Sequence, residues 1–316
     1  MSDYLIKRLI GALPVLFGVS VVIFFLMQMI PGDITAVLLG PMATEVAKAQ
    51  LRHALGLDQP IFFQYVKWLG LVLSGDFGMS IATSLPVSHL VLPKFGNTVI
   101  LATASLLLSL IVGFGIGAFA AARAGSTFDR ATMSITLVFG SIPPYWLGLV
   151  LVMIFALTLR WLPTTGMYDV IDPGGVRDVL RHLVLPTIAT AAAPAAIITR
   201  MVRTSMAEIL AQDFVRVARA KGIPRRVILW RHVLRNALPP IATITGLQLG
   251  YLLGGAVFTE VVFAWPGLGY QLTSSIVARD FPVVQAAVLL IALIFVVVNL
   301  AVDMLNAVID PRIRVS

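Results

Sequence analysis

The chain has no cysteine, and this absence removes two kinds of site. Without a thiol there is neither a disulfide nor a thiolate metal site. Charge is also scarce: 12% of the 316 residues are charged, whereas a soluble domain carries roughly a quarter. Because 59% of the residues are hydrophobic and the mean hydropathy is +0.95, we expect the chain to be solvated by lipid.

Catalytic signatures are missing too. The sequence has no Gly-Lys pair, which excludes a phosphate-binding loop of the GxxxxGK[ST] type, and it has neither HExxH nor GxSxG. The four histidines are scattered, so a zinc site is not expected: His53, His89, His182 and His232. We therefore predict no catalytic, metal or cofactor-binding residue in this chain and no enzymatic activity of its own.

Uncharged runs long enough to cross a bilayer, which takes about 20 apolar residues, occur six times. They predict an all-α membrane protein with six spans in one domain, residues 1–316, because backbone amides in lipid must bond within their own segment. The first run is too long for the apolar part of a signal peptide, so it is read as a retained helix. The spans are 9–30, 97–122, 131–159, 183–199, 237–259 and 281–302.

The distribution of basic residues predicts the orientation. If the N-terminus lies in the cytoplasm, the cytoplasmic segments 1–8, 123–130, 200–236 and 303–316 hold 15 of the 23 Lys and Arg residues. This excess follows the rule that cytoplasmic loops are the more basic, and it places the C-terminus in the cytoplasm as well. The formal net charge of +8 is therefore attributed to topology and not to a nucleic-acid partner.

The first outer loop, residues 31–96, contains two predicted helices. Thr44 to Leu57 has an amphipathic pattern, and Gly56 followed by Pro60 is a typical end signal. Ile61 to Leu73 is apolar and rich in aromatic residues, which is typical of a segment lying at the membrane interface.

Two glycine patterns fall inside predicted spans. Gly113 and Gly117, four residues apart, predict close helix packing of the small-xxx-small kind. A second series lies in the fifth span and leaves two interpretations open: a helix-packing face, or the wall of a translocation pathway with polar neighbours. Its residues are Gly246, Gln248, Gly250, Tyr251 and Gly254.

The cytoplasmic loop 200–236 holds nine basic residues and is the densest polar segment of the chain. Met201 to Arg219 is predicted to be helical, with a turn at Gly222 and a second helix starting near Pro224 and running to about Leu238. Anchoring to anionic lipid and setting of the topology account for some of these basic residues. They do not explain the interleaved Phe214, Val215, Val217 and Val227, which indicate a protein contact with an apolar centre and a polar rim.

These residues resemble a known family. The segment from Phe214 to Gly222, with Arg235 to Pro239, is similar to the "EAA" loop of permease subunits of bacterial ABC importers, more narrowly the dipeptide/oligopeptide/nickel group. The general pattern begins Glu-Ala-Ala; here that triplet is Arg-Val-Ala, and arginine at its first position is common in the peptide group. Further matching strings occur in the same order along nearly the whole chain: 29–33, 55–60, 74–78, 263–269, 279–285 and 310–314.

The resemblance implies the type I importer permease fold, a location in the bacterial inner membrane, and four kinds of contact. A homologous second permease would complete the pore, and two ATPase subunits carrying ATP and Mg would sit below it. An extracytoplasmic binding protein would deliver substrate to the outer loops 31–96 and 260–280, and membrane lipid would surround the subunit. The residues implied to couple to the ATPase are Phe214, Val215, Arg216, Val217, Ala218, Arg219, Ala220, Lys221, Gly222, Ile223, Pro224, Arg225 and Arg226.

The implied cargo is a dipeptide or oligopeptide, with glutathione, a nickel chelate or another small solute as alternatives in the same class. A stand-alone secondary transporter is the competing function. That function requires ionisable residues in mid-span to bind a coupling ion, and none of the six runs has one, since Glu260 and Asp303 lie at span ends. The partner permease and the pore-lining residues are not readable from the sequence.

Overall fold

The computed structural model describes residues 2–29, 43–169 and 171–309, and within these ranges the chain is built from helices. The matching strings at 30–33 and 310–314 lie outside the described residues. The helices are α1 Ser2–Met29, α3 Glu45–Leu55, α4 Ile61–Leu73, α5 Val87–Ala122, α6 Thr127–Ser141, α7 Pro144–Leu151, the π-helix η1 Val152–Thr158, α8 Gly175–Leu210, α9 Asp213–Ala220, α10 Arg225–Val227, the π-helix η2 Ile228–Val233, α11 Leu234–Gly255, α12 Val257–Val262, α13 Leu268–Val277 and α14 Phe281–Ile309.

Helices make up most of the described part of each predicted span, with a break in the third and another in the fifth. In the described part of the chain, α1, α5, α8 and α14 are long and apolar enough to cross a membrane by themselves, and a fifth span results if the bent pair α6 and α7–η1 counts as one. The fifth predicted span corresponds to α11, which has 22 residues but is not among the helices that meet this criterion. An all-α membrane protein is confirmed, whereas the number six and the orientation stay predictions.

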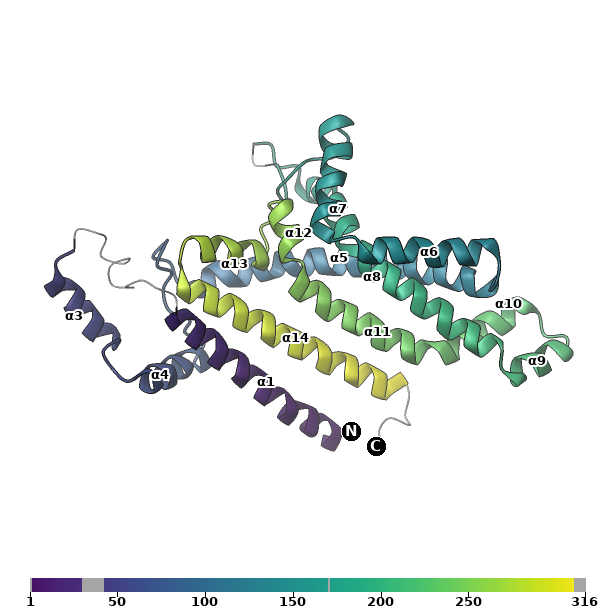
Figure 1. Cartoon of the computed structure of the whole chain (residues 1–316), viewed down its shortest axis with the longest axis horizontal. Coiled ribbons are helices and arrows are strands. Elements are labelled where there is room, and N and C mark those ends of the chain that lie inside the picture. The colour runs from purple at the N-terminus through teal and green to yellow at the C-terminus, as the bar shows by residue number, and fades with distance from the viewer. Residues whose placement is uncertain (1, 30–42, 170, 310–316) are drawn as a thin grey trace.

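The third predicted span, 131–159, is not a single straight helix. It divides at Ile142 and Pro143 into α6 and α7–η1, whose axes differ by 96°. Pro143 is the cap of α7 and Pro144 its first residue, and two consecutive prolines end a helix because they lack backbone donors and disfavour helical geometry in the preceding residue. In Figure 1, α7 stands roughly upright on the end of the horizontal α6.

The fourth predicted span, 183–199, is the middle of the 36-residue helix α8. The helix continues through Pro186 and Pro194, in keeping with the tolerance of buried membrane helices for proline. It also continues past the apolar run, so the segment 200–210 is part of α8 and not of a separate loop helix.

Helices α5 and α8 run parallel and pack closely along one seam. A β-carbon added at Gly113 would lie 2.8 Å from Ile198 Cγ2, and one added at Gly117 would lie 2.7 Å from the carbonyl oxygen of Thr199. Ser109 donates a hydrogen bond to the carbonyl of Ala191 on the same seam (3.0 Å). The predicted packing role of Gly113 and Gly117 is confirmed.

The outer-loop helices also match their sequence signals. Thr44 caps α3 by accepting a hydrogen bond from the Ala47 amide, and Gly56 ends it with a positive φ of 72°. In Figure 1, α3 and α4 lie beside the C-terminal end of α1, far from α9 and α10. The start of α1 and the end of α14 point instead toward the half of the molecule that holds α9 and α10 (Figure 1).

Candidate functional site

The segment Asp213–Val227, called the knob below, projects from one end of the molecule (Figure 1). The predicted helix Met201–Arg219 is wrong in its extent, because α8 ends at Leu210 and α9 begins at Asp213. The backbone of Gln212 is extended at this break, with ψ of 152°. The change of direction lets α9 place one apolar face against the end of the helix bundle.

The turn of the knob has the geometry of a Schellman cap. Gly222 has a φ of 75°, its amide donates to the Arg219 carbonyl (2.9 Å), and the Ile223 amide donates to the Ala218 carbonyl (3.2 Å). This pattern needs a left-handed residue, which glycine adopts most readily. Pro224 then caps α10. The turn predicted at 221–224 is therefore present.

Val215 anchors the knob and is fully buried. It belongs to an apolar cluster that joins the knob to α5, α8 and α11, and Ala218 and Ile223 pack against the same cluster. Because these contacts come from three long helices, a force on the knob acts on all of them. The buried members are Ala121, Ile198, Val202, Met206, Ile209, Val215, Ile228, Val233, Ala237 and Ile241.

The outer surface of the knob combines exposed apolar and basic side chains. Phe214, Val217 and Val227 are exposed, and Trp230 on η2 is 58% exposed beside them. Sequence reasoning missed Trp230, although a tryptophan between basic residues is itself a signal of an interface. The basic residues at this surface are also exposed: Arg216, Arg219, Lys221, Arg225 and Arg226.

The glycines of α11 face α14. A β-carbon at Gly246 would lie 2.2 Å from Val302 Cγ2, one at Gly250 would lie 3.1 Å from Phe295 Cε2, and Gly254 faces Ile291 at 3.9 Å. These contacts support the helix-packing interpretation of the three glycines. Gln248 is buried and Tyr251 is 47% exposed, so of the two polar neighbours only Tyr251 presents an exposed side chain.

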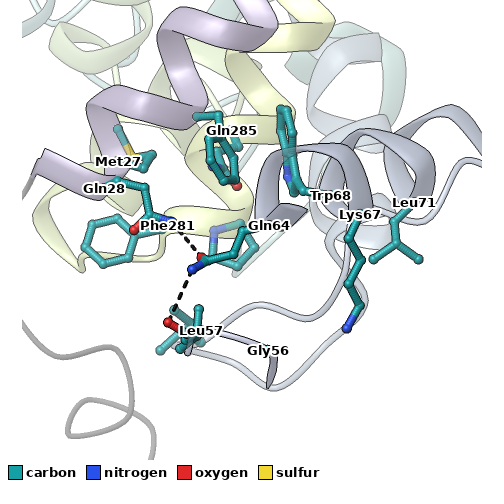
Figure 2. Close-up of a pocket in the computed structure, with 13 residues that line it drawn as sticks. Met27, Gln28, Gly56, Leu57, Gln64, Lys67, Trp68, Leu71, Phe281 and Gln285 are labelled. Atoms are coloured by element: carbon teal, nitrogen blue, oxygen red, sulfur yellow. Dashed lines mark hydrogen bonds between the residues drawn. The ribbon is translucent and has the colours of Figure 1, made fainter. Parts of the chain in front are cut away.

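A cavity of about 240 Å³ lies at the other end of the molecule, between α4, the end of α1 and the start of α14. Figure 2 shows three glutamine side chains of the lining near Trp68 and Phe281: Gln28, Gln64 and Gln285. Gln28 donates to Gln64 Oε1 (3.2 Å), and Gln64 donates to the Leu57 carbonyl (3.2 Å). These bonds connect the first outer loop to α1.

Two buried carboxylates tie distant segments together at this end. Glu260 accepts hydrogen bonds from the Thr98 hydroxyl (2.6 Å) and from the amides of Gly269 (2.7 Å) and Tyr270 (3.0 Å). Asp280 accepts from the Ser80 hydroxyl and the Ile81 amide (3.0 Å). Sequence reasoning noted Glu260 only as a charge at a span end, and its partner Thr98 is 162 residues away along the chain.

Helices of membrane-spanning length, with the knob anchored at one end of the bundle, define a polytopic membrane protein. No group of three His, Asp or Glu residues suited to a metal occurs in the ranges that the structure covers. Residues 113–315 match the family described as "Binding-protein-dependent transport system inner membrane component", and residues 1–102 match "Binding-prot-dependent transport system membrane comp, N-term". The chain belongs to this family.

Full-length relatives agree. The chain is 40% identical over 314 residues to the glutathione transport system permease protein GsiC of Escherichia coli K12, with 99% of both chains covered. It is 39% identical over 333 residues to the di/tripeptide transport system permease protein DppB of Pseudomonas aeruginosa UCBPP-PA14, again with 99% of both covered. The chain is thus a permease subunit of an ABC importer, a multi-pass protein of the inner membrane.

A solved structure supports the fold. An inward-facing conformation of the MetNI methionine ABC transporter aligns with a TM-score of 0.57 over 70% of this chain and 96% of that chain, at 19% identity. At this identity the likeness concerns the fold alone, and it agrees with the predicted type I permease architecture.

Proposed function

We propose that this permease imports short peptides and that its knob docks on an ATPase subunit in the cytoplasm. The observation that carries the docking proposal is the knob itself: a capped turn held on a buried apolar cluster, with Phe214, Val217 and Val227 exposed among basic residues. An exposed apolar centre with a charged rim is the composition of a protein interface. ATP and Mg would be held by the partner.

The partners follow from the family. A homologous permease completes the pathway, a binding protein delivers the substrate, and the ATPase subunits supply the energy. The binding protein contacts the loops 31–96 and 260–280. Asp280 bonds the described parts of these loops to each other through Ser80 and Ile81, and Glu260 bonds the second loop to Thr98 on α5. Tyr251 contributes a pathway-facing side chain from α11, while the three glycines pack on α14.

The substrate class rests on the two relatives, whose names give glutathione and di/tripeptides. Glutathione is itself a tripeptide, so both names describe one chemical class. Identities of 40% and 39% do not separate the two cargoes. We therefore propose a short peptide, with glutathione and an ordinary dipeptide as the two compounds to compare.

The docking proposal is tested by cross-linking. Because the natural chain has no cysteine, Val217→Cys introduces a single thiol on the exposed face of the knob. We expect a bifunctional thiol–amine reagent to join it to an ATPase subunit in membranes containing the whole importer. The matched control is Ile111→Cys, which is 72% exposed on α5 and lies within a predicted span. Equal cross-linking of both variants to the ATPase would contradict docking at the knob.

The substrate is tested by uptake of labelled glutathione and of a labelled dipeptide in cells with and without this chain. Loss of either uptake on deletion supports the peptide class and identifies the compound. Loss for a nickel chelate or a sugar, with both peptides unaffected, would overturn the class and leave the docking result standing.

A further inference from the structure

A buried ion pair close to the knob joins two helices far apart in the sequence. Arg203 on α8 donates from Nε to Asp129 Oδ1 (2.9 Å) and from Nη2 to Asp129 Oδ2 (2.6 Å). The side chain of Asp129, in the first turn of α6, is 3% exposed and that of Arg203 is 28% exposed. Two parallel bonds between a guanidinium and a carboxylate fix orientation as well as distance.

Asp129 also stabilises the turn that connects α5 to α6. Its Oδ2 accepts a hydrogen bond from the Gly125 amide (2.9 Å), and its own amide donates to the Ser126 hydroxyl that caps α6 (3.2 Å). The carboxylate therefore holds the turn and α8 at the same time. Any movement of α8 at Arg203 is passed to the start of α6.

The knob is bonded to the other side of this turn. The Arg225 guanidinium donates to the carbonyl of Ala122, the last residue of α5. A cation at a helix C-terminus interacts favourably with the unpaired carbonyls there. Together with the buried Val215, this bond fixes the knob to α5 as well as to α8.

These contacts form a closed ring of elements. It runs from the knob to the end of α5, through the turn to the start of α6, across the ion pair to α8, and along α8 back to the knob. Helices α1 and α14 lie outside the ring and are joined to each other at this end by the ion pair between Arg8 and Asp303 (3.0 Å).

We propose that Asp129 and Arg203 are positioning residues for transport, which make α6 move together with α8 when the knob is displaced. The argument rests on the proposed docking of the knob. A closed ring transmits displacement as a rigid body, whereas a ring opened at the ion pair lets α8 move while α6 stays behind. Helix α6 is followed, after a bend of 96°, by α7–η1. If α6 does not move with α8, α7–η1 is also displaced relative to the rest of the permease.

The test uses the complete importer reconstituted in vesicles, with three variants: Asp129→Asn, Arg203→Gln and the double variant. Three quantities are measured: assembled complex, ATP hydrolysis, and substrate taken up per ATP. Each single variant leaves one charge without its partner, so we expect less assembled complex from both. The double variant removes both charges and is expected to recover assembly.

Transport efficiency separates positioning from stability. We expect uptake per ATP to fall about tenfold in all three variants, a typical size for a coupling effect between sites, and the double variant not to recover it. A double variant that assembles and transports as efficiently as the wild type would overturn the proposal. So would a double variant whose efficiency falls only in proportion to lost assembly.

The matched control is the ion pair outside the ring. Asp303→Asn removes the negative charge that pairs with Arg8 at the same end of the molecule, as Asp129→Asn does for Arg203, but leaves the ring intact, so uptake per ATP should match the wild type. An equal loss of efficiency in this control would show that any broken ion pair at this end has the effect, and would overturn the specific role of Asp129 and Arg203. A wild-type importer with no ATP-dependent uptake, and no cross-link from Val217→Cys, would instead show failure of the proposed function.

Discussion

On the knob itself, the charged side chains lie on the surface, whereas at the opposite end two carboxylates are buried and bonded to backbone amides. Glu260 is fully buried and Asp280 is 3% exposed, while Arg216 and Asp213 on the knob form an exposed pair at 3.3 Å. Buried, bonded groups resist rearrangement because their separation leaves donors unpaired. The opposite end is therefore built to stay together, whereas the exposed surface of the knob is available for the docking that we propose.

The largest effect is expected from Gly267→Ala at the opposite end. The new β-carbon would lie 2.3 Å from Cδ of Glu260, which cannot withdraw because Thr98 and two amides hold it. We expect the free energy of unfolding to fall by about 3 kcal/mol or more, the upper range for overpacking. The measurement is the melting temperature of the purified complex, which should fall accordingly. Gly96→Ala is the control, since a β-carbon there meets nothing within 4 Å; equal melting temperatures for the two variants would contradict the crowded geometry.

A smaller effect is expected at Glu260 itself. Glu260→Ala leaves the amides of Gly269 and Tyr270 without their acceptor. We expect the free energy of unfolding to fall by about 2 kcal/mol in total, after allowing for the removal of the buried carboxyl group. Glu260→Gln keeps one carbonyl oxygen for these amides and should lose about 1 kcal/mol. Thermal unfolding of both variants in detergent checks the order. An alanine variant as stable as the glutamine variant would show that the amides do not depend on residue 260.

At the knob end, Gly222→Val should weaken function more than stability. Nothing lies within 4 Å of a β-carbon at Gly222, so the cost arises from the φ of 75° alone, about 1–2 kcal/mol for a β-branched side chain. We expect uptake to fall several-fold because the turn shapes the docking surface. Gly175→Val is the matched control, with a φ of 63° and open space but a position at the start of α8, away from the knob. Equal losses of uptake would remove the distinction between the two ends.

The smallest effect concerns pH in the outer loop. A hydrogen bond with Asp58 (2.6 Å) raises the pKa of His53 above its ordinary value, and the same bond lowers the pKa of Asp58. Stabilisation by the charged pair is complete below the ordinary pKa of His53, is lost as the pH rises through the raised value, and is lost again in acid as Asp58 is protonated. We expect faster amide exchange at the C-terminal turn of α3 at pH 8.5 than at pH 5.5, after correction for the intrinsic rates. His53→Ala should abolish the difference, and a difference that persists would contradict the assignment.

The sequence predicted features that depend on neighbouring residues. The turn at Gly222, the end of α3 at Gly56 and the packing of Gly113 and Gly117 follow from spacings of a few residues, and each is present. The bend of 96° also had a local signal in Pro143 and Pro144, but a count of apolar residues passes over two prolines without registering them. The count of apolar residues also underestimated the length of α8, because the helix continues into charged sequence at both ends.

The rest of the site had no local signal. Asp129 and Arg203 are 74 residues apart, and each alone resembles an ordinary charge in a cytoplasmic loop. Thr98 and Glu260 are separated by 162 residues. Only the folded arrangement of α5, α6 and α8 brings such groups together, so a single sequence predicts that the knob exists but not how it is linked to the bundle.

The separation between Ser80 and Asp280, 200 residues, has a consequence for biosynthesis. When α5 leaves the ribosome, Ser80 and Thr98 have no acceptors from the last third of the chain, because Glu260 and Asp280 have not yet been made. At this stage the first half of the protein lacks the hydrogen bonds from Ser80 and Thr98 to Asp280 and Glu260. Contacts of such high sequence separation form late. Formation of these hydrogen bonds is therefore one of the last steps in the folding of a newly made subunit.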